Sequence, residues 1–320
     1  MNNINKEIPI FFTIDNNYAP YLATALNSAI HNSSKDRKYK AIIIHQELSN
    51  ENKEKLSSQK TDNFDIEFVP MKQELDTITD SMSNRLRCDY FTLSIYFRIF
   101  IPSMFEQYDK GIYIDSDVVL NGDIAKLYDI DIGENYIGAC ADESVVAVPE
   151  LARYMENAIG VDRHKYINSG VLLMNLKKLR EKELDKHFLN LLNTYHFDCI
   201  APDQDYLNAI CNGKIHYLPN IWDTMPDDNK PINENAILIH YNLFAKPWCY
   251  DNIQYGDLFW KYAKDSGYYD ELKQFKASYS DEQKESDNKC MALLLERGDS
   301  IWKTDVTFKK MHESGVKIRL

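Results

Sequence analysis

The chain has 320 residues, of which 44% are hydrophobic and 27% are charged, and its formal net charge is −12. These values are typical of a globular protein with a sizeable core, and they exclude a fibrous or disordered chain. The negative net charge argues against a nucleic-acid partner. In addition, no basic stripe with interleaved aromatic residues occurs before residue 300. An anionic substrate would need a local cation, which a bound metal ion could supply.

The N-terminal part of the chain predicts alternating strands and helices. Short apolar runs with β-branched residues indicate buried strands at residues 8–14, 41–44 and 64–69. Apolar residues between 19 and 30 fall on one face of a helix, and a polar helix is expected at 50–60. The order βαβαβ predicts an α/β fold with a mostly parallel sheet and right-handed crossovers.

The pattern then repeats less regularly. An amphipathic helix is predicted over residues 92–101, and a strand over 111–114 leads directly into Asp115. The further elements expected are strands at 136–140, 170–174 and 236–239, and helices at 177–195 and 204–211. We expect the strand at 236–239 to be the last in the sheet.

After about residue 250 the sequence becomes rich in aromatic helical segments, and a polar stretch at 277–289 is interpreted as a linker. We therefore expect a main domain over residues 1–250 and a helical C-terminal extension over 251–320. The basic residues of 303–320 are compatible with a weak contact to an anionic membrane surface. The segment could equally well bind the acceptor or form a dimer contact. The sequence predicts no oligomeric state.

The six cysteines form no C-x-x-C pair, which favours reduced thiols in the cytoplasm. The first residues lack the apolar core of a secretory signal, and no apolar run approaches the roughly 18 residues of a membrane span. We expect a cytoplasmic protein, with the tail as its candidate contact to the cytoplasmic face of a membrane.

Three Asp-x-Asp pairs occur, and the bare pattern does not distinguish them. Only Asp115 and Asp117, with Ser116 between them, directly follow an apolar strand and precede another apolar stretch. Open α/β sheets bind ligands at the carboxyl ends of their strands, and paired carboxylates suit Mg²⁺ or Mn²⁺. A solvated turn is the alternative here, and it is the interpretation that we favour for the pair at 129 and 131.

His240 follows the apolar run 236–239, and Lys246 lies six residues further on. A neutral imidazole can complete a carboxylate metal site, and a nearby lysine can bind phosphate oxygens. Taken alone, however, a histidine at a strand end is more often a hydrogen-bonded structural residue.

Six motifs in order over residues 8–270 make the chain similar to glycosyltransferase family 8, which includes glycogenin and bacterial lipooligosaccharide galactosyl- and glucosyltransferases. Agreement of six ordered motifs is far more specific than any one of them. The motifs are Thr13 to Tyr18, Thr92 to Arg98, Tyr113 to Asp117, Tyr166 to Val171, Pro202 to Asp205, and His240-Tyr241 with Lys246-Pro247-Trp248.

The resemblance implies a GT-A nucleotide-sugar-binding fold and a donor site built from matching positions. Asp15 and Asn17 would contact the nucleobase and ribose, with Tyr18 stacked on the base. The metal ligands for Mn²⁺ or Mg²⁺ would be Asp115, Asp117 and His240, with Ser116 beside the donor and Lys246 on its diphosphate. From the residues alone, Asp15 and Asn17 are equally well explained as a turn and helix cap.

Around the transferred sugar the resemblance places Arg98, Asn168, Asp203 and Gln204, with Asp142 near both sugar and acceptor. Without it, Arg98 could snorkel or pair with an acid, Asn168 could form a turn, and Asp203 could favour a helix N-terminus. The family usually has a glycine between the histidine and the lysine, whereas this chain has none. Leu243, within that stretch, cannot take a positive φ cheaply, so we expect a different phosphate loop.

The implied activity is metal-dependent transfer of glucose or galactose from a UDP-sugar to a saccharide, lipid-linked or glycoprotein acceptor, with retention of configuration. Gln204 matches the residue nearest the reacting face, and an amide is a poor nucleophile, which favours front-face attack over a covalent intermediate. The alternatives are a phosphohydrolase of the haloacid dehalogenase type, a sugar-nucleotide pyrophosphorylase and a non-catalytic nucleotide-sugar-binding protein. The phosphohydrolase expects its nucleophile after the first strand, whereas three strands precede Asp115 here. The pyrophosphorylase needs a glycine-rich loop after the first strand, and Asp15-Asn16-Asn17 is not one.

Overall fold

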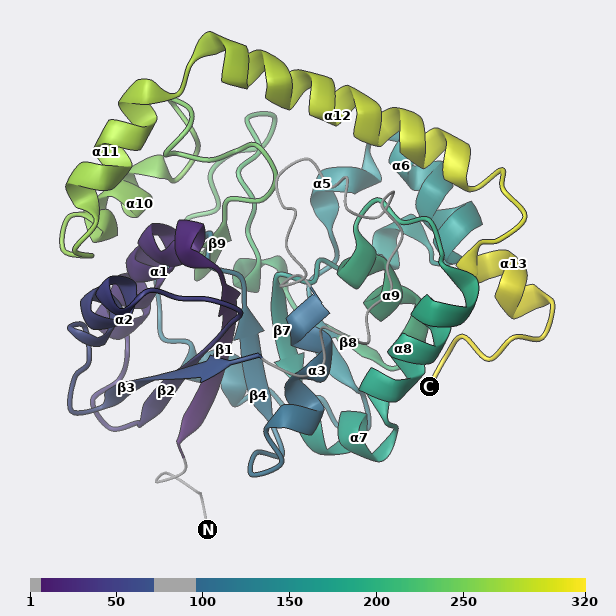
Figure 1. Ribbon diagram of the computed structural model, residues 1–320, viewed down its shortest axis with the longest axis horizontal. Coiled ribbons are helices and arrows are strands. Elements are labelled where there is room, and N and C mark those ends of the chain that lie inside the picture. The colour runs from purple at the N-terminus through teal and green to yellow at the C-terminus, as the bar shows by residue number, and fades with distance from the viewer. Residues whose placement is uncertain (1–6, 72–95) are drawn as a thin grey trace.

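The computed structural model describes residues 7–71 and 96–320, and its centre is a mixed seven-stranded sheet in the order β3-β2-β1-β4-β7-β6-β8 (Figure 1). A separate two-stranded sheet pairs β5 with β9. The strands are β1 (Ile8–Ile14), β2 (Tyr39–His45), β3 (Phe64–Pro70), β4 (Gly111–Ile114), β5 (Val118–Leu120), β6 (Ile137–Ala139), β7 (Val171–Met174), β8 (Ile215–Tyr217) and β9 (Leu238–His240).

Helices cover both faces of the large sheet, so the residues of its central strands β1, β4 and β7 are buried on both sides. Phe11 of β1 belongs to the core shared with α3, α7, α8 and α9, while Phe12 belongs to the core shared with α1 and α10. The α-helices are α1 (Ala19–His31), α2 (Asn50–Ser57), α3 (Phe97–Met104), α4 (Ala125–Tyr128), α5 (Glu143–Val146), α6 (Pro149–Tyr154), α7 (Leu176–Glu181), α8 (Leu184–Tyr195), α9 (Pro202–Ile210), α10 (Gly256–Ala263), α11 (Tyr269–Ser278), α12 (Asp281–Ile301) and α13 (Phe308–Glu313).

The predicted parallel βαβαβ unit is confirmed, because β1 pairs in parallel with both β2 and β4, and β2 with β3. The second half is mixed: β7 runs antiparallel to β4 and β6, and β8 is parallel to β6. The start of the helix predicted at 92–101 lies outside the described residues, and α3 continues past its predicted end to Met104.

Three predictions about elements were wrong. β9 pairs with β5 instead of ending the large sheet. The helix predicted at 177–195 is divided into α7 and α8, because Glu183 adopts a left-handed conformation with φ 52°. The polar stretch 277–289 is largely helical, since Ser280 and Gln283 form a capping box that begins α12.

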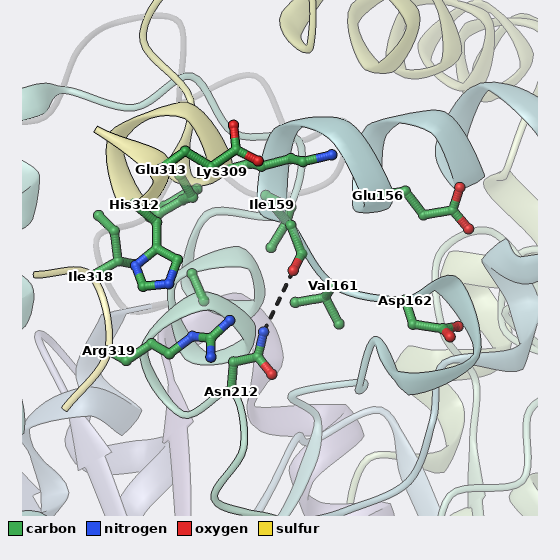
Figure 2. Close-up of a pocket in the computed structure, with 13 residues that line it drawn as sticks. Glu156, Ile159, Val161, Asp162, Asn212, Lys309, His312, Glu313, Ile318 and Arg319 are labelled. Carbon is green, nitrogen blue, oxygen red and sulfur yellow. Dashed lines mark hydrogen bonds between the residues drawn. The ribbon is translucent and has the colours of Figure 1, made fainter. Parts of the chain in front are cut away.

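The C-terminal extension is helical, as predicted, and Figure 1 shows α12 as a long helix between α11 and α6. The final residues pack against the main body: Ile318 is buried, its carbonyl lies 2.8 Å from Nε2 of His187, and the Leu320 amide donates to the Ile210 carbonyl. Beside α13 lies a cavity of about 280 Å³, whose lining includes the charged or polar residues Glu156, Asp162, Lys309, His312 and Arg319 (Figure 2). None of the described helices combines the length and the apolar character that a membrane crossing requires.

Candidate metal and donor site

The Asp115–Asp117 loop connects β4, in the middle of the large sheet, with β5 of the small one. β5 pairs antiparallel with β9 so that Val118 lies opposite His240, and the Tyr241 amide donates to the Asp117 carbonyl at 2.9 Å. The strand pairing of the small sheet therefore brings the histidine next to the aspartates.

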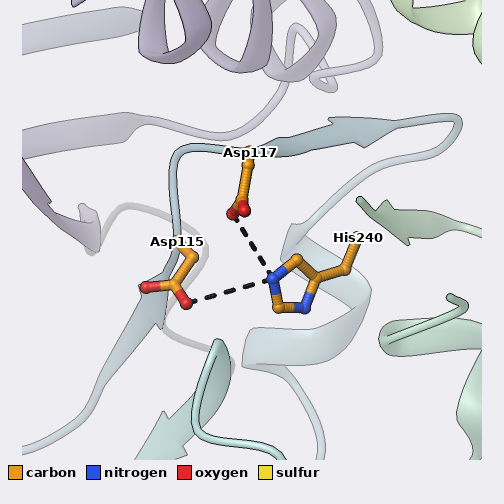
Figure 3. A group of neighbouring side chains, drawn as sticks. All are labelled: Asp115, Asp117 and His240. Atoms are coloured by element: carbon orange, nitrogen blue, oxygen red, sulfur yellow. Dashed lines mark ion pairs between the residues drawn. The ribbon is translucent and has the colours of Figure 1, made fainter. Parts of the chain in front are cut away.

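Asp115, Asp117 and His240 offer one potential ligand atom each, and these three atoms lie within 4.8 Å of one another (Figure 3). Nε2 of His240 is 3.3 Å from Oδ1 of Asp117 and 4.0 Å from Oδ2 of Asp115. Two carboxylates and an imidazole converging from separate segments form a donor set that suits Mn²⁺ or Mg²⁺. The residues present therefore fit a divalent ion.

Lys246 forms an ion pair with Oδ2 of Asp117, and both side chains are buried. Burial would raise the pKa of Asp117, but the positive charges of Lys246 and His240 outweigh it and lower this pKa. Burial alone would lower the pKa of His240, whereas Asp117 and Asp223 raise it to about 10. The cluster is thus a buried charge network in which Asp117 stays ionised.

Asp223, which the sequence analysis did not identify, accepts a hydrogen bond from Nδ1 of His240 at 2.9 Å. It lies just after the 3₁₀ turn Asn220–Trp222, and Thr224 hydrogen-bonds the Leu238 carbonyl of β9. This contact directs Nε2 towards the two aspartates, as carboxylates commonly do for metal-binding histidines. No sequence motif marks Asp223, because its place depends on how this turn packs against β9.

Arg98 of α3 is buried and joins the metal cluster to the predicted sugar side. It lies 2.9 Å from Oδ1 of Asp115 and 3.1 Å from Oδ2 of Asp203, and its Nη1 donates to the Ser169 carbonyl at 2.6 Å. The guanidinium also stacks over the Tyr113 ring at 4.3 Å. Of the alternatives that the sequence left open, snorkelling is excluded and pairing with acids is observed.

Asp142, Asn168 and Gln204 form a second buried polar group. Oδ2 of Asp142 accepts from Nδ2 of Asn168 at 3.2 Å and from Nε2 of Gln204 at 3.1 Å, while Oε1 of Gln204 accepts from the Ser169 amide. Oδ1 of Asp203 is buried and has no hydrogen-bond partner among the described residues. It is therefore available to accept a hydrogen bond from a ligand hydroxyl.

Gly170 permits close approach between the two groups. A Cβ at this position would lie 2.4 Å from Cε1 of His240 and 2.8 Å from Oδ2 of Asp115. Because no side chain could fit there, the motif Asn168-Ser169-Gly170 needs a glycine for close packing as well as for the turn.

In the other two Asp-x-Asp pairs, Asp129 and Asp205 have structural roles. Asp129 forms an exposed ion pair with Arg37 at 2.9 Å, in agreement with the predicted surface turn. Asp205 is fully buried and accepts hydrogen bonds from the hydroxyls of Tyr154 and Tyr166, unlike its neighbour Asp203.

Asp15, Asn17 and Tyr18 line a cleft of about 720 Å³, which also contains Lys246 and Trp248. Oδ1 of Asp15 accepts from the amides of Asn17 and Tyr18, so the turn-and-cap interpretation of this segment is correct. Burial raises the pKa of Asp15. A capping role does not prevent the segment from contacting a ligand, because the same residues line the cleft.

Leu243 lines the same cleft and does adopt a positive φ, of 51°. The conformation that we expected to be costly for this residue is therefore present in the loop, and the different mode of phosphate binding stays a prediction. Its amide is bonded to Oδ1 of Asn242, and the loop accepts the backbone strain that a glycine would avoid.

A sequence model described as glycosyl transferase family 8 matches residues 9–252. A Haemophilus influenzae protein, provisionally named a glycosyltransferase, is 30% identical over 235 residues, which cover 73% of this chain and 68% of that protein. The lipopolysaccharide 1,2-glucosyltransferase of Escherichia coli K12 is 26% identical over 198 residues, with 54% of this chain and 56% of that protein covered.

Among solved structures, the galactosyltransferase LgtC, determined with donor and acceptor sugar analogues, superposes with a TM-score of 0.68 at 26% identity. The match covers 80% of this chain and 95% of that one. The bifunctional glycosyltransferase WbbM gives a TM-score of 0.73 at 21% identity, and the matched region spans 87% of this chain but about half, 53%, of that one. The second likeness concerns the fold alone, and together with LgtC it identifies a GT-A fold.

Proposed function

The chain belongs to glycosyl transferase family 8, and from this premise we propose that it is a retaining hexosyltransferase that uses a UDP-sugar donor and a divalent ion, Mn²⁺ or Mg²⁺. The observation that carries the proposal is the convergence of Asp115, Asp117 and His240 to within 4.8 Å at the end of β4. Lys246 forms an ion pair with Asp117 and also lines the cleft that is lined by Asp15 and Tyr18. The candidate metal site thus adjoins a cleft with room for a nucleotide.

The leaving group of such a transfer is a nucleoside diphosphate, whose growing negative charge must be stabilised. Bound at Asp115, Asp117 and His240, the ion would supply Lewis-acid stabilisation of this charge. Lys246 would exchange its contact with Asp117 for phosphate oxygens, and it can do so because both partners belong to the same site. Asp15, Asn17 and Tyr18 would hold the nucleoside, and Ser116 the adjoining part of the donor.

On the sugar side, the orphaned Oδ1 of Asp203 would accept a hydrogen bond from a sugar hydroxyl, while Arg98 fixes Oδ2 of the same carboxylate. Asn168 and Gln204 would lie against the sugar, and Asp142 between sugar and acceptor. We favour front-face attack, because the amide of Gln204 is a poor nucleophile and both oxygens of Asp142 already accept hydrogen bonds.

The named relatives guide the choice of substrates. They include lipopolysaccharide 1,2-glucosyltransferases and a 1,3-galactosyltransferase of Salmonella typhimurium, which is 25% identical over 173 residues. We therefore propose glucose or galactose as the transferred sugar, and a saccharide or glycoconjugate as the acceptor.

The test is hydrolysis of UDP-glucose and UDP-galactose without acceptor, measured as UDP release with and without Mn²⁺. We expect Mn²⁺-dependent release with one of the two sugars, and its loss in Asp117→Ala. Asp131→Ala removes an aspartate from an unrelated, exposed Asp-x-Asp pair and serves as the matched control. Full activity of Asp117→Ala with added Mn²⁺ would falsify the metal assignment, and cleavage of p-nitrophenyl phosphate in place of the UDP-sugars would favour a phosphohydrolase.

A further inference from the structure

The cleft of about 720 Å³ has two walls that come from different parts of the chain. The inner wall consists of the segment Asp15 to Tyr21 and the loop Leu243 to Tyr250, which carries Lys246. The outer wall belongs to the C-terminal extension, with Phe275 of α11, Tyr279 just after it and Asp287 of α12. The extension thus closes one side of the cleft that leads to the metal cluster.

Both walls are aromatic. On the inner wall Tyr21 stacks on Trp248 with ring centroids 4.4 Å apart. On the outer wall Tyr279 packs against Tyr250 and Phe275, each at 5.8 Å. Phe275 is 38% exposed although it lines the cleft. Exposed aromatic faces along a cleft suit a planar base, because every nucleobase has a face on which an aromatic ring can stack.

Asp287 connects the outer wall to the loop that carries Lys246. Its Oδ2 accepts hydrogen bonds from the hydroxyls of Tyr250 and Tyr279, the second at 2.7 Å. The Tyr250 amide in turn donates to the Lys246 carbonyl at 2.9 Å, and Lys276 of α11 donates to the Tyr250 carbonyl at 2.9 Å. Movement of α11 or α12 would therefore be transmitted to the position of Lys246.

We propose that α11 and α12 complete the donor site: Phe275 contacts the nucleobase of the donor, and Asp287 positions the loop that binds its diphosphate. This inference rests on the proposed function and gives the extension a role within the same site. The ligand of the outer wall is the nucleoside part of a nucleoside diphosphate, because the diphosphate would be held by Lys246, which contacts Asp117 of the metal cluster.

The first experiment compares two probes, UDP and inorganic pyrophosphate, each titrated calorimetrically into the full chain with saturating Mn²⁺. For Phe275→Ala we expect about tenfold weaker binding of UDP, as for the loss of one base-stacking ring, and unchanged binding of pyrophosphate, which has no base. Leu293→Ala is the matched control, because Leu293 is an exposed apolar residue of α12 that does not line the cleft. It should bind both probes like the wild type.

The second variant is Asp287→Ala, which should weaken both probes, since it releases the phosphate loop, and leave the affinity for Mn²⁺ alone unchanged. Equal UDP affinity in Phe275→Ala and the wild type would overturn the nucleobase contact, as would an equal loss for pyrophosphate. Unchanged binding of both probes by Asp287→Ala would overturn the positioning role. If the wild-type chain binds no UDP, the proposed function itself fails, and this inference with it.

Discussion

At the scale of single residues, Asp223 has the clearest untested role. It is buried, holds Nδ1 of His240 at 2.9 Å, and leaves its own Oδ2 without a partner among the described residues. A histidine whose ring is fixed in this way presents Nε2 to a metal without losing rotational freedom on binding. Asp223 would therefore support the proposed metal site without touching the ion.

We expect Asp223→Ala to weaken Mn²⁺ binding by about 10- to 100-fold, the range seen when such supporting carboxylates are removed. Asp223→Asn should recover much of the affinity, because its amide oxygen can still accept from Nδ1. Electron paramagnetic resonance of free Mn²⁺ during a titration measures both values. Identical Mn²⁺ affinity in Asp223→Ala and the wild type would show that His240 needs no support.

His45, at the end of β2, gives a pH dependence that is independent of the metal site. It is 4% exposed, neither ring nitrogen has a hydrogen-bond partner among the described residues, and burial lowers its pKa from 6.5 to about 4. The unfolded chain binds a proton near pH 6.5, whereas the folded protein binds it only near pH 4. Stability from the neutral ring is thus complete above pH 6.5 and is lost as the pH falls towards 4.

Between pH 7.5 and 5 we expect this histidine to lower the free energy of unfolding by about 1 to 2 kcal/mol. His45→Leu places an apolar side chain that cannot be protonated at this buried position, so it should lose this part of the pH dependence. Urea unfolding of both proteins at the two pH values measures the difference. An equal loss of stability in His45→Leu and the wild type would assign the effect to other groups.

At the scale of elements, the predictions succeeded where the sequence determines structure locally. The apolar runs of β1, β2 and β4 are buried on both faces, so their composition alone predicted strands. The pairing of β9 with β5 could not be predicted, because no local signal states which sheet a three-residue strand joins. The sequence likewise predicted His240 but not Asp223, because the position of Asp223 follows from the packing of the turn Asn220–Trp222 against β9.

α12 shows a local signal that composition concealed. Its first turns are polar and were interpreted as a linker, yet Ser280 and Gln283 form a reciprocal capping box. Such a box satisfies two backbone amides that would otherwise lack partners. Helix initiation therefore outweighs the lack of an apolar face, and the helix becomes amphipathic only further along.

Ser280→Ala should destabilise the start of α12 by about 1 kcal/mol, the usual effect of losing a serine cap. Native-state hydrogen exchange of the amides in the first turns of α12 measures this as roughly fivefold faster exchange. Ser300→Ala, near the other end of the helix, is the matched control, because its hydroxyl donates to the Arg297 carbonyl of the preceding turn and caps no helix start. Equal exchange in the two variants would contradict a role for the capping box.

At the scale of the whole molecule, the predicted metal ligands come from distant segments of the chain and from both sheets. Asp115 and Asp117 follow β4 of the large sheet, His240 ends β9 of the small one, and Arg98 and Asp203 bring α3 and α9 to the same place. An ion bound there would contact the folded protein and not the unfolded chain. Its binding energy should therefore add directly to stability.

At a Mn²⁺ concentration one hundred times the dissociation constant, binding should add about 2.7 kcal/mol to the free energy of unfolding. For a chain of this length it should raise the midpoint of thermal unfolding by about 4 °C. Differential scanning calorimetry with Mn²⁺ and with the chelator EDTA measures the increment.

Asp117→Ala starts from lower stability, because it leaves Lys246 buried without its carboxylate. The increment due to Mn²⁺ is the informative quantity, and we expect it to vanish in this variant. It should persist in Asp131→Ala, and an increment of the same size in Asp117→Ala would mean that the ion binds elsewhere.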